Sequence, residues 1–428
     1  MIHFFHFFYP KKNKISYYTF PQPFFLFRFS FLTVLTVFIA CSPADRFTKK
    51  NEASPVTSEL RVLISEFNTG EFLNVQSSSY LNDNSSRLAL LKPESPIQIF
   101  ENNGNIRLTI YGKDYIGRRF FISPKDNEES IKVNGKQYRG KIQVSSSNNT
   151  IDLINLVSLE DYVKGVLAKE MPIGKKDENF EALKALAICV RTYSLKKLSD
   201  GKIYFDLYSD TRDQVYAGVD AENPLSNKAV DETKKLVLQY EDKPALIYYH
   251  STCGGYTESS KNVFTKDPVP YLISIKDGDE PYCKISPRFH WKEIYEKDEI
   301  ISRLKNYNLL ENTNYILKDI SISNKFNSGR VSELEIKVID SDNNEKLLVI
   351  RGNEIRNILR TSDNKNILWS TLFDLAINFN LVMLTGNGYG HGVGLCQWGA
   401  IALSRKGWNY KEILQHYYPG TFPKTYND

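Results

Sequence analysis

The sequence predicts an α+β fold that mixes helices with antiparallel strands and has a β-rich N-terminal accessory part and a strand-containing insertion. Residues 59–155 alternate apolar and polar positions in short runs that Asn, Gly and Ser interrupt, as half-buried strands do. The first strong helical periodicity appears between residues 156 and 291, and residues 292–375 combine a helical stretch with short strands. A chain of 428 residues is long enough for two or three domains.

The N-terminal residues are typical of an export signal. Basic residues come first, and an apolar run of twelve residues, Phe29 to Ala40, ends at Cys41. A bilayer span needs about 20 apolar residues, so this run is too short for one. We expect residues 1–40 to be a signal peptide and residues 41–58 a lipidated tether that begins at Cys41, which places the protein outside the cytoplasm on a membrane surface. The alternative is an ordinary signal peptide followed by a chance cysteine.

The charge balance excludes one class of partner. The chain contains 55 Lys and Arg residues against 50 Asp and Glu residues, and four of the basic residues lie within residues 1–40. The remainder is therefore almost neutral and lacks the basic footprint of nucleic-acid binding. We predict no nucleic-acid partner.

A helix is predicted in the segment SLEDYVKGVLAKEMPIG, Ser158 to Gly174. Ser158 can cap this helix, Asp161 sits at the reciprocating position, and Pro172 stops it. Glu170 lies four residues after the last valine of an apolar stripe at helical spacing, so it continues that stripe. The stripe comprises Leu159, Tyr162, Val163, Val166 and Leu167.

Glu170 is the strongest candidate for chemistry. Desolvation on an apolar helix face raises the pKa of a carboxyl group, and a raised pKa makes the group a usable proton donor near neutral pH. The alternative is a helix-end glutamate that faces water or pairs with Lys169 or Lys175.

A second helix is predicted in ENFEALKALAICVRTYSL, with Asp177 or Asn179 as its cap. Arg191 and Tyr193 lie toward its C-terminal end. Arg191 could steer a carboxylate or an anionic sugar substituent, or it could be a surface charge that complements the helix dipole.

The stretch GNGYGHGVGLCQWGA, Gly386 to Ala400, places six glycines around His391. The glycines allow the backbone to approach another segment or a substrate closely, and Gln397 and Trp398 could bond or stack on a sugar. The alternative is a tight turn that needs several residues with positive φ. A nucleotide-binding loop is excluded because no strand–loop–helix unit with a downstream acid follows.

Two Cys–His pairs suggest either a metal site or a bridge. His250 and Cys253, with Cys283 and His290, form a Cys2His2 set that a structural zinc ion would accept. A Cys253–Cys283 disulfide is an equal alternative in an exported protein, and two free thiols are the third. Cys189 is predicted to be a core residue.

Four segments resemble one known family in the family's order. EMP, a short loop and EALKALAICVRTYSL resemble the central signature of the stage II sporulation protein D and amidase enhancer (SpoIID/LytB) family. DTRDQVYAG (210–218), YHSTCGGYTESSKNVF (249–264) and GYGHGVGLCQWGA with YYPGT resemble its other motifs. The resemblance covers roughly residues 60–425. It implies that residues 156–428 form a SpoIID-type catalytic domain, with an α/β insertion at 292–375.

The resemblance implies a lytic transglycosylase that cleaves peptidoglycan glycan strands, with no cofactor required for the chemistry. The glutamate before Met-Pro, here Glu170, would be the acid/base, and Asp206, Asp210 and Asp213 are the candidates if a second acid is needed. The alternatives are a non-enzymatic protein that binds glycan and activates a cell-wall amidase, and a zinc hydrolase that cuts the amide between sugar and peptide. The residues expected to line the cleft are Arg191, Tyr193, Gln214, Tyr216, His391 and Gln397.

Overall fold

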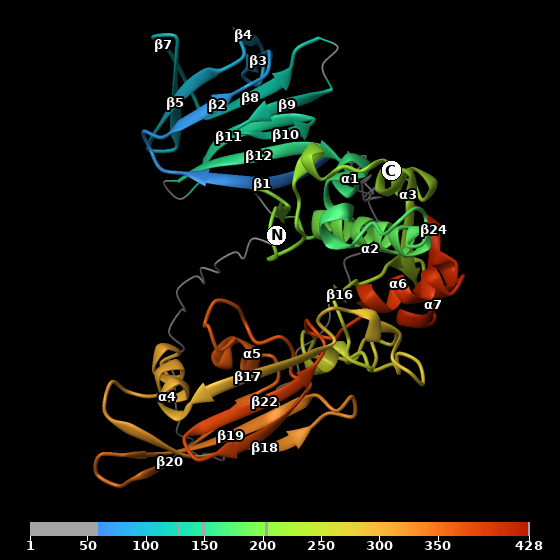
Figure 1. Ribbon diagram of the computed structural model, residues 1–428. Helices are drawn as coiled ribbons and strands as arrows, with labels where there is room; N and C mark the ends of the chain where they lie inside the picture. The colour runs from blue at the N-terminus through green and yellow to red at the C-terminus, as the bar shows by residue number, and fades with distance from the viewer. Residues whose placement is uncertain (1–58, 127–128, 148–149, 202–203, 427–428) are drawn as a thin grey trace, which may run out of the picture. The chain divides into compact units, whose positions relative to one another are not determined.

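A computed structural model describes most of the chain beyond the N-terminal segment (Figure 1). The described residues are 59–426, with gaps at 127–128, 148–149 and 202–203. The predicted signal peptide, the tether and Cys41 therefore lie outside the described residues. Within the described part, no helix is both long enough and apolar enough to cross a membrane.

The fold class is α+β, as predicted: helices and mostly antiparallel sheets are mixed along the described chain. The strongest helices lie in the middle and at the C-terminus. The helices are α1 (Leu159–Glu170), α2 (Phe180–Ser199), α3 (Pro224–Glu232), α4 (Lys297–Asn306), α5 (Glu354–Leu359), α6 (Gln397–Arg405) and α7 (Tyr410–Tyr417).

The N-terminal region forms two sheets from the strands that alternation predicted. In spatial order, the seven-stranded sheet is β13 (Leu207–Tyr208), β1 (Glu59–Phe67), β12 (Thr150–Ser158), β11 (Lys141–Ser147), β8 (Arg119–Pro124), β3 (Ser79–Asn82) and β4 (Arg87–Leu91). The six-stranded sheet is β10 (Lys136–Arg139), β9 (Ser130–Val133), β2 (Phe72–Val75), β5 (Ser95–Asn102), β6 (Asn105–Ile110) and β7 (Lys113–Gly117). Because β13 pairs in parallel with β1, a segment beyond α2 completes the first sheet.

Four smaller sheets lie in the remainder of the described chain. They are β15 (Lys243–Pro244), β14 (Leu236–Tyr240) and β24 (Phe422–Thr425); β16 (Tyr249–His250) and β23 (Leu395–Cys396); β17 (His290–Glu296), β22 (Leu381–Asn387) and β21 (Phe373–Asn378); and β18 (Tyr315–Lys325), β19 (Val331–Asp340) and β20 (Glu345–Arg351). The short parallel pair of β16 and β23 joins the glycine-rich stretch to the segment that holds His250.

The helix that carries Glu170 begins where β12 ends. Ser158 closes β12, and its hydroxyl accepts a hydrogen bond from the backbone N–H of Asp161 at 3.2 Å, which caps α1. The predicted apolar stripe of α1 is buried. Met171 is extended and Pro172 follows, so the helix stops at Glu170. The predicted cap, stripe and end of this helix are confirmed.

α2 is surrounded by other helices and contacts α1, α3, α6 and α7. Its small residues Ala182, Ala185 and Ala187 are fully buried, and they allow neighbouring backbones to approach closely. Asn179 precedes the helix, but its side-chain amide donates to the carbonyl of Pro172 at 3.0 Å and does not cap α2. This bond ties the loop after Glu170 to the start of α2.

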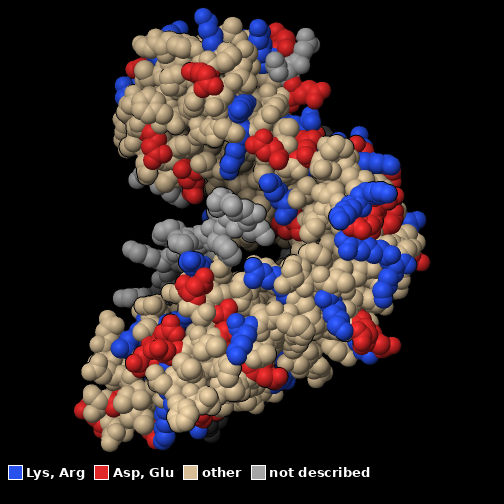
Figure 2. Space-filling model, viewed as in Figure 1, with Lys and Arg blue, Asp and Glu red and all other residues tan. Residues whose placement is uncertain are grey.

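Two large apolar clusters hold the described chain. One joins residues of both N-terminal sheets with residues of α1, α2, α6 and α7, so the strand-rich region and the helices share a core. The other is built from residues 291–384 and contains the buried side chains of α4, α5 and the strands around them. Figure 2 shows basic and acidic side chains interspersed over the visible face, in keeping with the near-neutral composition.

Candidate active site

Two hydrogen-bond donors from distant segments hold the partly buried carboxyl group of Glu170. Its Oε1 accepts from the backbone N–H of Val215 at 2.8 Å. Its Oε2 accepts from Nε2 of Gln397, the first residue of α6, at 3.4 Å. The fold thus brings the end of α1, the loop after β13 and the glycine-rich stretch together at one carboxyl group.

Burial raises the pKa of Glu170 above its ordinary value, while the hydrogen bonds from Val215 and Gln397 act in the opposite direction. The net direction is upward, as the apolar stripe on α1 led us to expect. A carboxyl group with a raised pKa remains protonated in a larger fraction of molecules near neutral pH. Glu170 therefore has the property that a general acid requires.

Gln214 lies in a buried polar cluster next to Glu170. Its Oε1 accepts hydrogen bonds from the hydroxyls of Tyr162 at 3.1 Å and Ser194 at 3.2 Å. Burial and the nearby charge of Glu170 raise the pKa of Tyr249 well above its usual range. The Gln214 side chain acts on the pKa of Tyr249 in the opposite direction, so these two side chains lie close to each other. The cluster therefore places buried polar side chains beside the carboxyl group.

The three aspartates considered as second acids are all paired with basic residues. The pairs are Arg61–Asp206 at 2.7 Å, Arg212–Asp210 at 2.6 Å and Lys197–Asp213 at 3.0 Å. Asp213 also accepts a 2.6 Å hydrogen bond from Tyr193, so the hydroxyl of Tyr193 is committed to this aspartate. These carboxylates hold the loop that carries Gln214.

Arg191 is fully buried, which corrects the expectation that it contacts a substrate. Its Nε and Nη2 donate to the two carboxylate oxygens of Glu160 at 3.0 and 2.7 Å, and its Nη1 donates to the carbonyl of Leu236 at 3.0 Å. A side chain without exposed surface cannot line a cleft. Arg191 instead ties α1 and α2 to β14.

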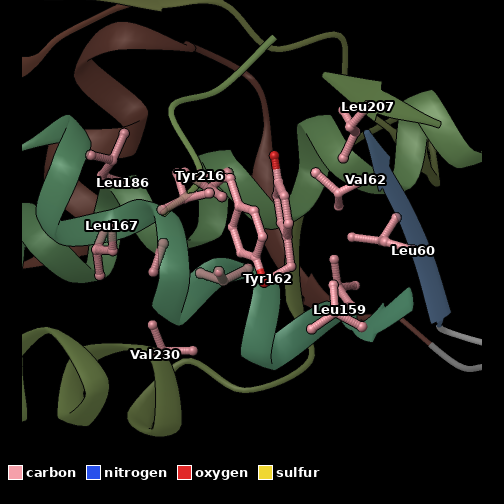
Figure 3. Packing of buried hydrophobic residues seen from close by; sticks show 14 of the residues in the cluster. Leu60, Val62, Leu159, Tyr162, Leu167, Leu186, Leu207, Tyr216 and Val230 are labelled. Carbon is pink, nitrogen blue, oxygen red and sulfur yellow. The ribbon is translucent and has the colours of Figure 1, made fainter. Parts of the chain in front are cut away.

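Tyr216 is also a core residue, which corrects its expected place in the cleft. Its ring stacks on that of Tyr162, with centroids 5.0 Å apart, as Figure 3 shows. Its hydroxyl donates to Oδ1 of Asn155 at 2.7 Å. A Cβ atom at Gly165 would lie only 2.4 Å from the Tyr216 ring, so the glycine on α1 makes room for this tyrosine.

Both ring nitrogens of His391 bond to the protein backbone. Nδ1 accepts from the N–H of Val393 at 3.1 Å, and Nε2 pairs with the carbonyl of Tyr249 at 3.0 Å, so Nε2 carries the proton. The glycines serve the same packing: a Cβ atom at Gly394, where φ is +72°, would lie 2.0 Å from the carbonyl oxygen of Tyr248. The glycines therefore allow the stretch to approach another backbone segment of the same chain, and His391 holds the stretch against β16.

Protonation of His391 is expected to destabilise the fold in acid. Burial, with the charges of Arg356 and Arg330, lowers the pKa of His391 from 6.5 to about 3. As pH falls from 6.5 toward 3, the unfolded chain binds a proton that the folded chain excludes, so the free energy of unfolding decreases. Replacing His391 with Gln should reduce this loss when urea unfolding is measured across the interval. If the free energy of unfolding of His391→Gln falls with pH as steeply as that of wild type, the expectation is wrong. The control is His290→Gln, which changes an exposed histidine and should keep the wild-type slope.

The predicted Cys2His2 set is replaced by a different group. Cys253 and Cys283 lie together, but their partners are Asp277 and Cys396, with all four ligand atoms within 4.8 Å of one another and all four residues buried. Such a group could hold a metal ion. Cys253 and Cys283 are free cysteines whose sulfurs lie 3.4 Å apart. The two residues therefore do not form the disulfide that was the alternative to a metal site.

Neither histidine of the predicted set belongs to this group. Nδ1 of His290 bonds to the side chain of Asn387 at 2.6 Å, and the residue is exposed. Nδ1 of His250 bonds to the carbonyl of Val393 at 3.1 Å, so this histidine serves the packing of β16. The set fails because Nδ1 of each histidine bonds to another segment, to the carbonyl of Val393 or to the side chain of Asn387, and neither histidine lies among the grouped ligand atoms.

Three residues of interest were not predicted as site residues from the sequence: Tyr249, Asp277 and Cys396. Cys396 was available as a fourth cysteine directly before Gln397, and Asp277 lies six residues before Cys283. Neither spacing is that of a familiar metal motif, so only the fold reveals the group. Tyr249 carried no signal beyond its place beside His250.

Comparison with known proteins supports the resemblance found in the sequence. A family model described as stage II sporulation protein matches residues 147–240, and a domain of unknown function (DUF8618) matches residues 283–394. An uncharacterized protein of Brachyspira hyodysenteriae is 33% identical over 304 residues, which cover 71% of this chain and 76% of that protein.

Two relatives from Bacillus subtilis have descriptive names. The amidase enhancer is 32% identical over 362 residues, which cover 76% of this chain but only 49% of the enhancer. Stage II sporulation protein D is 29% identical over 287 residues, which cover 62% of this chain and 74% of that protein. With these matches, and with the family's motifs meeting around Glu170, the chain belongs to the stage II sporulation protein D and amidase enhancer family.

Proposed function

We propose that this protein is an extracytoplasmic lytic transglycosylase that cleaves peptidoglycan glycan strands, with Glu170 as general acid and base. The observation that carries the proposal is the Glu170 carboxyl group, partly buried, with a raised pKa and held by Val215 and Gln397. Family membership supports a role at the cell wall. The proposal includes a lipid anchor at Cys41 and a catalytic domain at residues 156–428 that contains the 292–375 insertion.

The paired aspartates favour a mechanism with one carboxyl group. Ordinary glycosidases use two carboxyl groups, one as acid and one as base or nucleophile. Here the aspartates weighed as a second acid are each paired with a lysine or arginine. A lytic transglycosylase needs only one group, because the sugar supplies its own nucleophile.

The proposed reaction proceeds in two proton transfers. Protonated Glu170 first gives its proton to the glycosidic oxygen, and the bond from that oxygen to the anomeric carbon breaks. The Glu170 carboxylate then accepts the proton of the muramyl 6-hydroxyl as that oxygen bonds to the same anomeric carbon. Glu170 ends protonated again, no water is consumed, and the products are a new chain end and a 1,6-anhydro-muramyl end.

Mass spectrometry of the products tests this function directly. Purified protein is incubated with isolated glycan strands stripped of stem peptides, and anhydro ends are distinguished from reducing ends by the mass of one water. Anhydro products support the proposal. Reducing ends indicate a hydrolase instead, and an absence of products with retained glycan binding supports a non-enzymatic role.

The non-enzymatic role is the second candidate because one relative is named an amidase enhancer. In that case the chain would bind glycan and stimulate a cell-wall amidase, and Glu170 would have no catalytic part. An assay of a purified cell-wall amidase with and without this protein decides the point. Stimulation that is unchanged in Glu170→Gln, together with no product from the protein alone, would favour the enhancer.

Removing the Gln397 hydrogen bond is expected to shift the pH profile upward. This bond lowers the pKa of Glu170, so Gln397→Met should raise that pKa further. Because the acid must be protonated, kcat/KM falls as pH rises through this pKa, and the alkaline limb should move to higher pH. Gln98→Met on β5 is the control. If the alkaline limb of kcat/KM stays at the same pH or moves to lower pH in Gln397→Met, Glu170 is not the acid whose pKa it reports.

A further inference from the structure

The buried group of Cys253, Asp277, Cys283 and Cys396, called here the thiol cluster, gathers ligands from four segments. Cys253 follows β16, Asp277 lies in a loop, Cys283 lies in the short helix Tyr282–Ile285, and Cys396 ends β23. The side chains of Cys253, Cys283, Cys396 and Asp277 are essentially without solvent exposure. A fully buried carboxyl group is rare unless it is paired, and the three thiols beside it are ligand types that zinc accepts.

The spacing of the sulfurs suits a tetrahedral ion. The sulfurs of Cys253 and Cys283 are 3.4 Å apart. Zinc holds thiolates at about 2.3 Å, which places two sulfurs of a tetrahedron about 3.8 Å apart. A disulfide requires about 2.05 Å. The observed separation is somewhat shorter than that of two zinc ligands but far longer than that of a bridge, and all four ligand atoms lie within 4.8 Å of one another.

Backbone and side-chain donors already point at the ligand atoms. The sulfur of Cys396 accepts from the N–H groups of Cys253 at 3.2 Å and Gly399 at 3.4 Å, and the sulfur of Cys253 accepts from the N–H of Gly255 at 3.4 Å. The hydroxyl of Tyr417 donates to Oδ1 of Asp277 at 2.7 Å. Such bonds orient metal ligands and stabilise thiolates.

A buried arginine supplies the charge that this ligand set needs. Arg330, directly before β19, donates from Nη2 to the carbonyl of Cys253 at 2.7 Å, and its guanidinium lies against Gly392. Its Nε and Nη1 have no hydrogen-bond partner among the described residues, although the side chain is almost fully buried. Zinc with three thiolates and a carboxylate has a net negative charge, which an adjacent arginine offsets in part.

We propose that Cys253, Asp277, Cys283 and Cys396 bind one zinc ion, which fixes the start of α6 and thereby the position of Gln397. Four protein ligands complete the tetrahedron, so the site is structural and does not itself activate water. Cys396 directly precedes Gln397, which donates to Glu170. The ion would thus connect the loops around residues 253–283 to the segment that holds the candidate catalytic carboxyl group.

The first test measures metal in the wild-type protein, which needs no variant to fold. The full chain is purified without chelator, and its zinc content is determined by elemental mass spectrometry; about one zinc per chain is expected. After the zinc is replaced by cobalt, absorption from thiolate-to-cobalt charge transfer should appear. Absence of metal after incubation with zinc, or a Cys253–Cys283 disulfide found by non-reducing peptide mapping, overturns the proposal.

Variants then assign the ligands. Cys283→Ser and Cys396→Ser should lose most of the bound zinc and melt at lower temperature, whereas Cys189→Ala should keep its zinc. Cys189 is the matched control because it is a buried free cysteine outside the thiol cluster. Arg330→Met, which keeps all four ligands, should weaken zinc binding by roughly 10- to 100-fold. Retained zinc in both serine variants contradicts the assignment. These readouts are independent of glycan cleavage.

Discussion

Glu170→Gln is expected to slow the release of 1,6-anhydro products by about 10²- to 10⁴-fold, the usual contribution of a general acid–base residue. The amide has nearly the same shape and can still accept the hydrogen bond from Val215. It has no acidic proton to give to the glycosidic oxygen and no carboxylate to receive one from the 6-hydroxyl. Initial rates of anhydro-product release from peptide-free glycan, followed by mass spectrometry, measure the effect.

Two controls separate lost chemistry from lost structure. Glu311→Gln changes an exposed glutamate in the same way and should leave the rate unchanged. Glu170→Gln should keep the wild-type circular dichroism spectrum and should still bind glycan in a pull-down assay. If Glu170→Gln releases anhydro products as fast as wild type, Glu170 is not the catalytic acid.

Arg191→Met is expected to lower the free energy of unfolding by about 3–5 kcal/mol, the loss typical of removing one partner from a buried ion pair. Methionine fills much of the volume of the arginine stem but removes the Arg191 donors from Glu160 and from the carbonyl of Leu236. Within the described part of the chain, Oε1 of Glu160 keeps only the backbone N–H of Lys235, at 3.1 Å. The Arg191 side chain is fully buried and that of Glu160 is 18% exposed, so water can replace only part of the lost hydrogen bonding without opening the helices.

Urea unfolding followed by circular dichroism measures this loss. Arg351→Met is the matched control, because Arg351 pairs with Glu333 at 2.8 Å on the surface, where an ion pair contributes about 0–1 kcal/mol. A loss in Arg191→Met no larger than in the control would contradict the structural role of Arg191. In that case the hypothesis that Arg191 contacts the substrate would be favoured again.

Local sequence patterns were enough to place the candidate acid. The cap at Ser158, the stripe on α1 and the proline at 172 each depend only on residues of this helix and its ends, and all three appear in the structure. The expectation that Glu170 lies on an apolar face follows from the same periodicity. Gln397 was predicted to line the cleft because it lies in the glycine-rich stretch, and its amide donates a hydrogen bond to Glu170.

The roles of Arg191, Tyr216 and the cysteines depended on contacts between distant segments. Arg191 follows the helical pattern of a residue near a C-terminus, but its environment is set by Glu160 and β14, which the periodicity of α2 does not encode. Tyr216 meets the ring of Tyr162, a partner from another helix.

The sequence by itself determined the α+β class, the helix that ends at Glu170 and the motifs of the family. Only the tertiary structure decided which cysteines meet. Asp277 and Cys396 join Cys253 and Cys283 because the β16–β23 pairing and the turn before the short helix at 282–285 bring them within 4.8 Å. Sequence spacing fixes ligands only when they share one turn or helix, and these four belong to segments that meet only through tertiary contacts.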